Sequence, residues 1–252
     1  MQPFPRSVWL PAILVSLLPF SVFGHSAVEP VPRTDGGWKD RHELLNKRAA
    51  EAGDKAQVIF IGDSITQGWE GAGKDVWARY YAHRNAVNLG IGGDRTQHVL
   101  WRLDNGNLNG LKPKAAVLMI GTNNSGSNTS EQIAAGVKAI VEKLREKLPT
   151  TKVLVLAIFP RADNLDASKN KVEKGTKDDA KRKVNESANE IIKKLADNKM
   201  VFYLDIGPKF LAADGTLSRE VMPDLLHLNE GSYRTWAEAI EPKVKELMGE
   251  TK

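Results

Sequence analysis

The stretch Val58-Ile-Phe-Ile-Gly-Asp-Ser-Ile-Thr-Gln-Gly68 joins a run of apolar residues to a Gly-Asp-Ser break. The apolar run does not alternate with polar residues, which is typical of a β-strand covered on both faces by other elements. Glycine and aspartate end such a run and favour a turn. The stretch therefore predicts a buried strand, with Ser64 just beyond its carboxyl end at one edge of a sheet.

Four further apolar runs have the same character, and amphipathic helical patterns lie around and between them. The runs are Ala86–Leu89, Ala115–Ile120, Val153–Ile158 and Met200–Leu204. The helical patterns are Trp38–Ala52, Ile133–Leu148 (opened by the capping-box sequence Thr129-Ser-Glu-Gln132), Asp178–Asp197 and Gly231–Met248. Alternating strands and helices indicate βαβ units. We predict an α/β fold, a three-layer α/β/α sandwich of the flavodoxin kind with a five-stranded, mainly parallel sheet.

The composition favours one domain with ordinary polar chemistry. The chain has 252 residues, 41% of them hydrophobic, which is enough for one substantial core. It has no cysteine, so disulfides, thiolate catalysis and cysteine-based zinc sites are excluded. The net charge of +5 owes much to lysines around residues 169–183, which we interpret as a solvated surface. We therefore expect no nucleic-acid partner.

The first 24 residues have the pattern of a secretory signal peptide. Arg6 precedes the apolar stretch Val8–Phe23, and Val22-Phe-Gly24 offers a small residue for cleavage. We expect a secreted or periplasmic protein without a membrane span after cleavage; an uncleaved anchor is the alternative. Residues 25–37 are rich in proline and glycine and predict a flexible leader. Residues 38–252 then form a single domain.

Ser64 has a candidate partner near the other end of the chain, in the sequence Asp224-Leu-Leu-His227. A serine hydroxyl becomes a good nucleophile when a neutral imidazole can take its proton and a carboxylate holds that imidazole in the required tautomer. The three-residue separation lets one turn carry both Asp224 and His227. The hypothesis is a serine hydrolase with Ser64 as nucleophile, His227 as base and Asp224 as its orienting carboxylate.

Hydrolysis of an ester also requires hydrogen-bond donors for the negative oxygen of the tetrahedral intermediate. Ligands bind beyond the carboxyl ends of strands in open α/β sheets, so the segments that follow the strands are the places to search. Gly93 follows the second predicted strand and can offer a backbone N–H at close approach. Asn123 follows the third and can offer its amide. With the N–H of Ser64, these groups predict an oxyanion hole.

These blocks resemble the SGNH (or GDSL) family of serine esterases and lipases, from about Val58 to Met248. The segment from Asn88 to Leu103, NLGIGGDRTQHVLWRL, is more specific and closely resembles the catalytic subunits of the intracellular, type I platelet-activating factor acetylhydrolase. The resemblance implies a three-layer fold, no cofactor or metal ion, and cleavage of short acyl, especially acetyl, esters. It assigns the nucleophile to Ser64, the oxyanion donors to Gly93 and Asn123, and the acid–base pair to Asp224 and His227.

The same resemblance suggests a small acyl pocket and a possible homodimer, since the related subunits pair. Ile65, Thr122 and Leu226 adjoin the catalytic residues and are the predicted pocket walls. This chain departs from those relatives in its predicted export and in a longer, lysine-rich loop over residues 161–180. The substrate therefore stays open between a phospholipid and an acetylated sugar or polysaccharide.

Two other functions fit the sequence less well than hydrolysis. A non-catalytic carbohydrate- or lipid-binding module is disfavoured because a binder has no need of a proton relay. A phosphate or nucleotide binder is disfavoured because the first loop lacks a glycine-rich run with lysine.

Four polar residues near the predicted site are expected to have structural roles. We interpret Asp63 as a hydrogen-bonding residue beside the nucleophile. Asp94 and His98, four residues apart, predict a hydrogen bond if the segment is helical. Arg161 predicts a surface ion pair, with contact to an anionic substrate as the alternative.

Overall fold

The computed structural model describes residues 26–162 and 179–250 of the chain. Its five-stranded sheet has the order β2-β1-β3-β4-β5, and every pair of neighbouring strands is parallel. The strands are β1 (Val58–Gly62), β2 (Val87–Gly90), β3 (Ala115–Met119), β4 (Lys152–Leu156) and β5 (Val201–Leu204). Each begins and ends within two residues of its predicted bounds. The predicted α/β fold with a five-stranded parallel sheet is confirmed.

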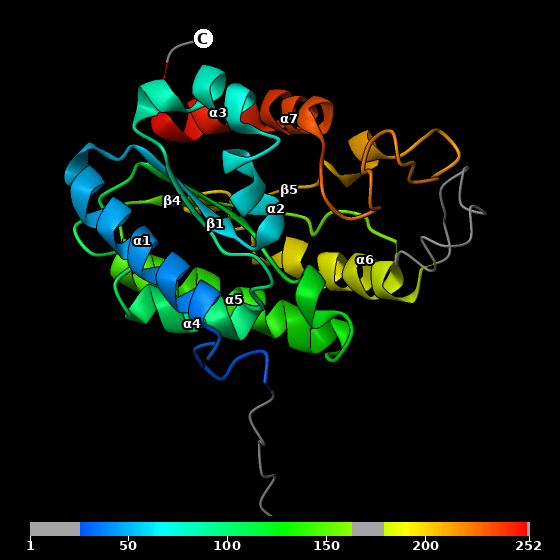
Figure 1. Cartoon of the computed structure of the whole chain (residues 1–252), viewed down its shortest axis with the longest axis horizontal. Coiled ribbons are helices and arrows are strands. Elements are labelled where there is room, and N and C mark those ends of the chain that lie inside the picture. Colours follow the sequence, from blue (N-terminus) through cyan, green and yellow to red (C-terminus); the bar gives the residue numbers. More distant parts are fainter. Residues whose placement is uncertain (1–25, 163–178, 251–252) are drawn as a thin grey trace, which may run out of the picture.

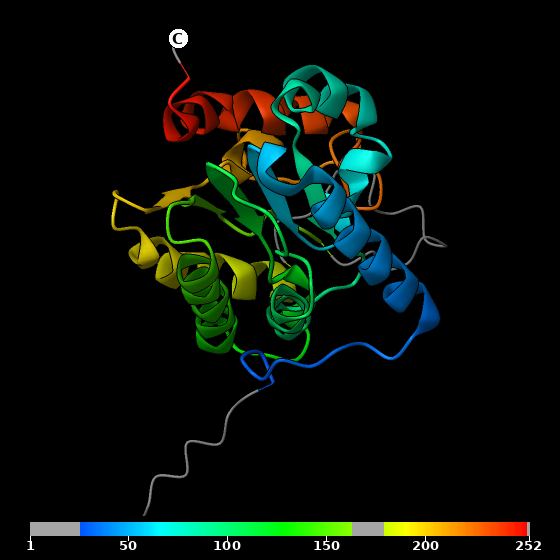
Figure 2. The same ribbon diagram turned by 90° about the vertical axis from the view of Figure 1, so that its left-hand side faces the viewer.

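Helices cover both faces of the sheet (Figure 1). They are α1 (Gly36–Ala52), α2 (Ser64–Gln67), α3 (Lys74–Tyr80), α4 (Thr96–Asp104), α5 (Ser130–Lys147), α6 (Ala180–Ile192) and α7 (Glu230–Met248). Helices α1, α4, α5 and α6 share one core with the sheet, and α3 and α7 share the other. Figure 2 shows these layers, with α7 in red above the sheet and α5 and α6 in green and yellow below it.

Burial on both faces explains the unbroken apolar runs. Ile59 and Ile61 point into the core beneath α1, α4 and α5, whereas Val58 and Phe60 point into the opposite core. All four side chains have no exposed surface. Side chains alternate between the two faces of a strand, so a strand covered on both faces needs apolar residues at every position. Phe60 also contacts a cluster of aromatic rings that includes Trp69 and Trp236.

The ends of the long helices follow from their sequences. The predicted capping box of α5 is present, because Thr129 accepts from the N–H of Gln132 while the Gln132 side chain accepts from the N–H of Thr129. α7 begins after Asn229, whose side chain accepts from the N–H of Ser232. No helix within 26–162 and 179–250 is long and apolar enough to cross a membrane.

The segment that precedes α1 lies against the domain. The hydroxyl of Thr96 donates to the carbonyl oxygen of Ala27 at 2.7 Å, and the N–H of Val31 donates to the carbonyl oxygen of Gln97. Ala27 has no exposed surface. The packed surface therefore includes residues that the sequence assigns to a flexible leader. The predicted signal peptide at 1–24 and residues 163–178 of the predicted long loop lie outside the described residues.

The strand order brings the predicted site together. β1 lies between β2 and β3, so the segments that follow these three strands meet at one sheet edge. Ser64 follows β1, Gly93 follows β2 and Asn123 follows β3. In an open α/β sheet with this order, the switch in winding beside β1 is where ligands bind.

Candidate active site

Ser64 is the first residue of α2, directly beyond the end of β1. The preceding residue, Asp63, is the N-cap, and its Oδ1 atom accepts from the N–H of Ile65 at 3.0 Å. Asp63 is fully buried, and this burial, with the charge of nearby Asp94, raises the pKa of Asp63 to about 7. Asp63 therefore has the structural role that the sequence predicts.

Asp224 and His227 lie on one tight turn before α7. Oδ1 of Asp224 accepts from the backbone N–H groups of Leu226 and His227, at 3.0 and 2.7 Å. Leu225 between them adopts a left-handed conformation with φ of 62°, which costs a residue with a Cβ about 1–2 kcal/mol. Burial of the Leu225 side chain and the hydrogen bond of Ala162 N–H to its carbonyl oxygen hold this turn.

The turn points its imidazole at the serine. Nε2 of His227 lies 2.8 Å from Oγ of Ser64, and Nδ1 of His227 lies 2.6 Å from Oδ2 of Asp224. Partial burial opposes the charge of Asp224, but hydrogen bonds from His227 and Leu226 outweigh it and lower the pKa of this carboxyl. A charged Asp224 accepts the proton on Nδ1, which leaves Nε2 free to accept from Ser64. The arrangement can therefore activate the hydroxyl.

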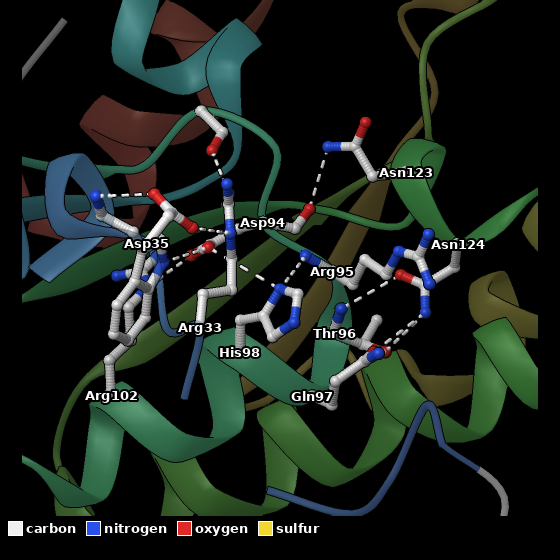
Figure 3. A network of polar contacts seen from close by, with 12 residues as sticks. Arg33, Asp35, Asp94, Arg95, Thr96, Gln97, His98, Arg102, Asn123 and Asn124 are labelled. Carbon is white, nitrogen blue, oxygen red and sulfur yellow. Dashed lines mark hydrogen bonds and ion pairs between the residues drawn. The ribbon is translucent and has the colours of Figure 1, made fainter. Parts of the chain in front are cut away.

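Two further donors border this edge of the sheet. Gly93 is exposed, has a φ of +76°, and its N–H forms no hydrogen bond with any described residue. The side-chain amide of Asn123 donates to the carbonyl oxygen of Asp94 at 2.9 Å (Figure 3). An amide group has two N–H donors, so Asn123 can still donate to a second acceptor.

The three predicted pocket residues differ in how much surface they present. Ile65 and Thr122 are 1% and 2% exposed, whereas Leu226 is half-buried. The Thr122 hydroxyl accepts from Asn185 and from Arg161. Leu226 is therefore the one of the three that offers a substrate appreciable surface.

Arg161 is buried and does not lie at the surface as predicted. Its side chain also donates to the carbonyl oxygen of Thr122. The polar groups after β3 accept from this guanidinium, which allows its burial.

The predicted hydrogen bond between Asp94 and His98 is also wrong. Nδ1 of His98 is 3.8 Å from the Asp94 carboxylate and instead accepts from the N–H of Arg95 at 3.0 Å. α4 begins after Asp94, so the helical four-residue spacing does not apply to this pair. Burial, followed by the charges of neighbouring arginines, lowers the pKa of His98 to about 4.

Asp94 pairs with two side chains that no sequence motif marks as its partners. Its carboxylate accepts from Nε1 of Trp38 at 2.6 Å and from Nε of Arg102 at 2.7 Å. Arg102 also donates to the carbonyl oxygen of Gly62 at the end of β1 and to Asn107. Asp94 and Arg102 have no exposed surface. This buried ion pair therefore joins the end of β1 to the segment after β2, whose Asp94 carbonyl accepts from Asn123. Figure 3 shows Arg102, Asp94 and Asn123.

No group of three or more histidine, aspartate or glutamate side chains that could hold a metal ion occurs in the part of the chain that the structure describes.

Comparison with known proteins shows the family to which this chain belongs. Residues 60–235 match the GDSL-like Lipase/Acylhydrolase family. The platelet-activating factor acetylhydrolase IB subunit alpha1 of Homo sapiens is 36% identical over 230 residues, which cover 89% of this chain and 91% of that subunit.

Solved structures share the fold at lower identity. A GDSL-like lipase from Bacteroides thetaiotaomicron has a TM-score of 0.64 at 16% identity, over 81% of this chain and 97% of that one. An acetylxylan esterase from Geobacillus stearothermophilus, solved as a catalytic mutant, has a TM-score of 0.57 at 15% identity, over 79% and 96% of the two chains. Together with the family match and the human relative, this fold places the chain in the GDSL-like lipase/acylhydrolase family of carboxylic ester hydrolases.

Proposed function

We propose that this protein hydrolyses acetyl and other short-chain carboxylic esters through Ser64, His227 and Asp224. The contact that supports the proposal best is the unbroken line of hydrogen bonds from Asp224 through His227 to Ser64, at 2.6 and 2.8 Å. Residues 163 positions apart in the chain have no reason to meet in this order in a protein that only binds a ligand. The alternative of a non-catalytic carbohydrate- or lipid-binding module is therefore the weaker one.

The proposed reaction has two halves. Ser64 Oγ attacks the ester carbonyl while His227 takes its proton, and His227 then returns this proton to the leaving alcohol. Water, activated by the same imidazole, cleaves the acyl-serine and releases the carboxylic acid. In both halves the negative carbonyl oxygen accepts from the N–H groups of Gly93 and Ser64 and from the Asn123 amide.

Replacement of Asn123 by alanine should lower kcat about 10²–10³-fold and change KM little, because the lost donor interacts mainly with the charge that develops in the transition state. Hydrolysis of p-nitrophenyl acetate measures both constants. Asn109→Ala, in an exposed turn, is the matched control and should keep wild-type activity. A KM effect alone, with kcat intact, would contradict an oxyanion role for Asn123.

The acyl chain should be short. The human relative is named for an acetylhydrolase activity, and Leu226, half-buried next to His227, is the predicted residue that would contact the acyl group. We expect kcat/KM for p-nitrophenyl acetate to exceed that for the octanoate by about tenfold or more, with the butyrate between them. Equal rates for acetate and octanoate would contradict the small pocket and leave the serine mechanism intact.

The alcohol part of the ester remains a choice between two classes. The human relative is named as a subunit of a platelet-activating factor acetylhydrolase and shares 36% identity, so we favour an acetylated phospholipid. An acetylated polysaccharide is the second candidate. It ranks lower because the acetylxylan esterase resembles this chain in fold alone. Acetate release from a short-chain acetylated phospholipid and from acetylated xylan would separate them. Export directed by residues 1–24 and pairing of two subunits stay predictions from the sequence.

A further inference from the structure

The proposed oxyanion donor of Gly93 belongs to a peptide group made by two glycines. The carbonyl of Gly92 and the N–H of Gly93 are the two ends of one trans peptide, so they point in opposite directions. Whatever fixes the direction of the Gly92 carbonyl therefore also fixes the direction of the Gly93 N–H.

The turn that contains this peptide can exist in two forms. The N–H of Asp94 donates to the carbonyl oxygen of Ile91, which closes a β-turn with Gly92 and Gly93 at its centre. The positive φ of Gly93, +76°, makes it type II. Type I and type II turns differ by a flip of the central peptide, and two glycines place little steric restriction on that flip. The turn sequence alone therefore does not hold the donor in place.

A guanidinium from outside the family-matched region holds it instead. Nη1 of Arg33 donates to the carbonyl oxygen of Gly92 at 2.6 Å. The N–H of Gly92 donates to Oε1 of Gln67 at 2.6 Å. A hydrogen bond from a charged donor is roughly twice as strong as one between neutral groups.

Arg33 is itself held by its surroundings. Its Nε donates to Oδ2 of Asp35 at 3.0 Å, and Oδ1 of Asp35 caps α1 by accepting from the N–H of Trp38. The side chain of Arg33 is 29% exposed, so solvent reaches it only in part. Hydrogen bonds of the Ala27 carbonyl oxygen and the Val31 N–H with α4 fix the backbone that carries Arg33.

We infer that Arg33 is a positioning residue for the oxyanion hole, an inference that rests on the proposed function. Its bond to the Gly92 carbonyl keeps the central peptide in the type II orientation, with the Gly93 N–H directed away from Arg33. The same bond polarises the peptide, since a donor at the carbonyl oxygen strengthens the N–H at the other end. The hydrogen bonds of Arg33 go to Gly92 and Asp35, and the proposal gives it no contact with Ser64 or with the substrate.

The test compares steady-state hydrolysis of p-nitrophenyl acetate by Arg33→Met, Arg33→Lys and the wild type. Methionine keeps an apolar stem and removes the donors; we expect kcat to fall about tenfold, less than for loss of a donor itself, with KM within about twofold. Lysine keeps a charged donor and should recover most of the lost kcat. Arg48→Met, which loses only a contact to Glu70, is the matched control and should have wild-type constants.

The outcomes separate this inference from the proposed function. Inactivity of the folded wild type would end the proposed function itself. An active wild type with an equally active Arg33→Met would overturn only the role of Arg33. A raised KM at unchanged kcat would also overturn it, because it would indicate a substrate contact. Thermal melting checks the fold of each variant. If Arg33→Met does not fold, Arg33→Gln replaces it as the uncharged variant. Its neutral donor has a shorter reach, so its kcat should also fall.

Discussion

Replacement of Ser64 by alanine is expected to reduce kcat for p-nitrophenyl acetate by about 10⁴-fold or more. The variant keeps the binding surface and the oxyanion donors but has no hydroxyl to form the acyl intermediate. Ser64 is partly exposed at the start of a short helix, and alanine fits this position without new contacts. The fold should therefore be kept, and thermal melting of the variant checks this.

Ser187→Ala is the matched control, because Ser187 is exposed on α6 and alanine favours a helix. Its activity should equal that of the wild type. A covalent probe adds an independent measurement: a fluorophosphonate should add one label to the wild type, detected by intact mass, and none to Ser64→Ala. Equal turnover by the wild type and Ser64→Ala would remove this serine from the mechanism.

Replacement of Arg102 by methionine is expected to lower the stability by about 3–5 kcal/mol, because it leaves the carboxylate of Asp94 buried and without its ion-pair partner. For a domain of this size that corresponds to a fall in Tm of about 6–20 °C. The measurement is thermal unfolding at neutral pH. Residual activity should also fall, since Asp94 orients Asn123 through its backbone carbonyl.

A double variant and a surface control sharpen this prediction. Asp94→Asn combined with Arg102→Met removes both charges and should be more stable than Arg102→Met alone. Arg234→Met breaks an ion pair with Glu230 whose side chains are 54% and 57% exposed, and should change stability by less than about 1 kcal/mol. A Tm of Arg102→Met within about 2 °C of the wild type would show that the buried pair does not support the site.

The sheet and the long helices could be predicted because their signals are local. β1 and β3 are apolar at every position, and a capping box at Thr129 marks the start of α5. The short helices α2 and α3 have no such signal, since four or seven residues are too few to display a helical period. The sequence therefore indicates which residue follows each strand but not the short helices α2 and α3 that come after β1.

The residues of the candidate site likewise fall into those that the sequence identifies and those that it does not. Ser64, Asp224 and His227 could be singled out because their residue types and positions are meaningful for a reaction. Arg102 and Arg161 could not, because arginine is rarely buried and nothing in the sequence marks the acceptors that permit it. Arg33 lies in a segment whose prolines and glycines are typical of a linker, and its bond to Gly92 joins residues 59 positions apart. Contacts of that kind exist only once the whole domain has folded.

The packing of the N-terminal segment has a practical consequence for anyone who shortens this protein. A fragment trimmed to residues 60–235 would lack Trp38 and Arg33 and would cut β1 after its second residue. Asp94 would lose one of its two side-chain donors, and the Gly92 carbonyl its guanidinium. The folded domain is therefore larger than the family signature, because residues 27–38 bind α4, the Gly92–Gly93 turn and Asp94.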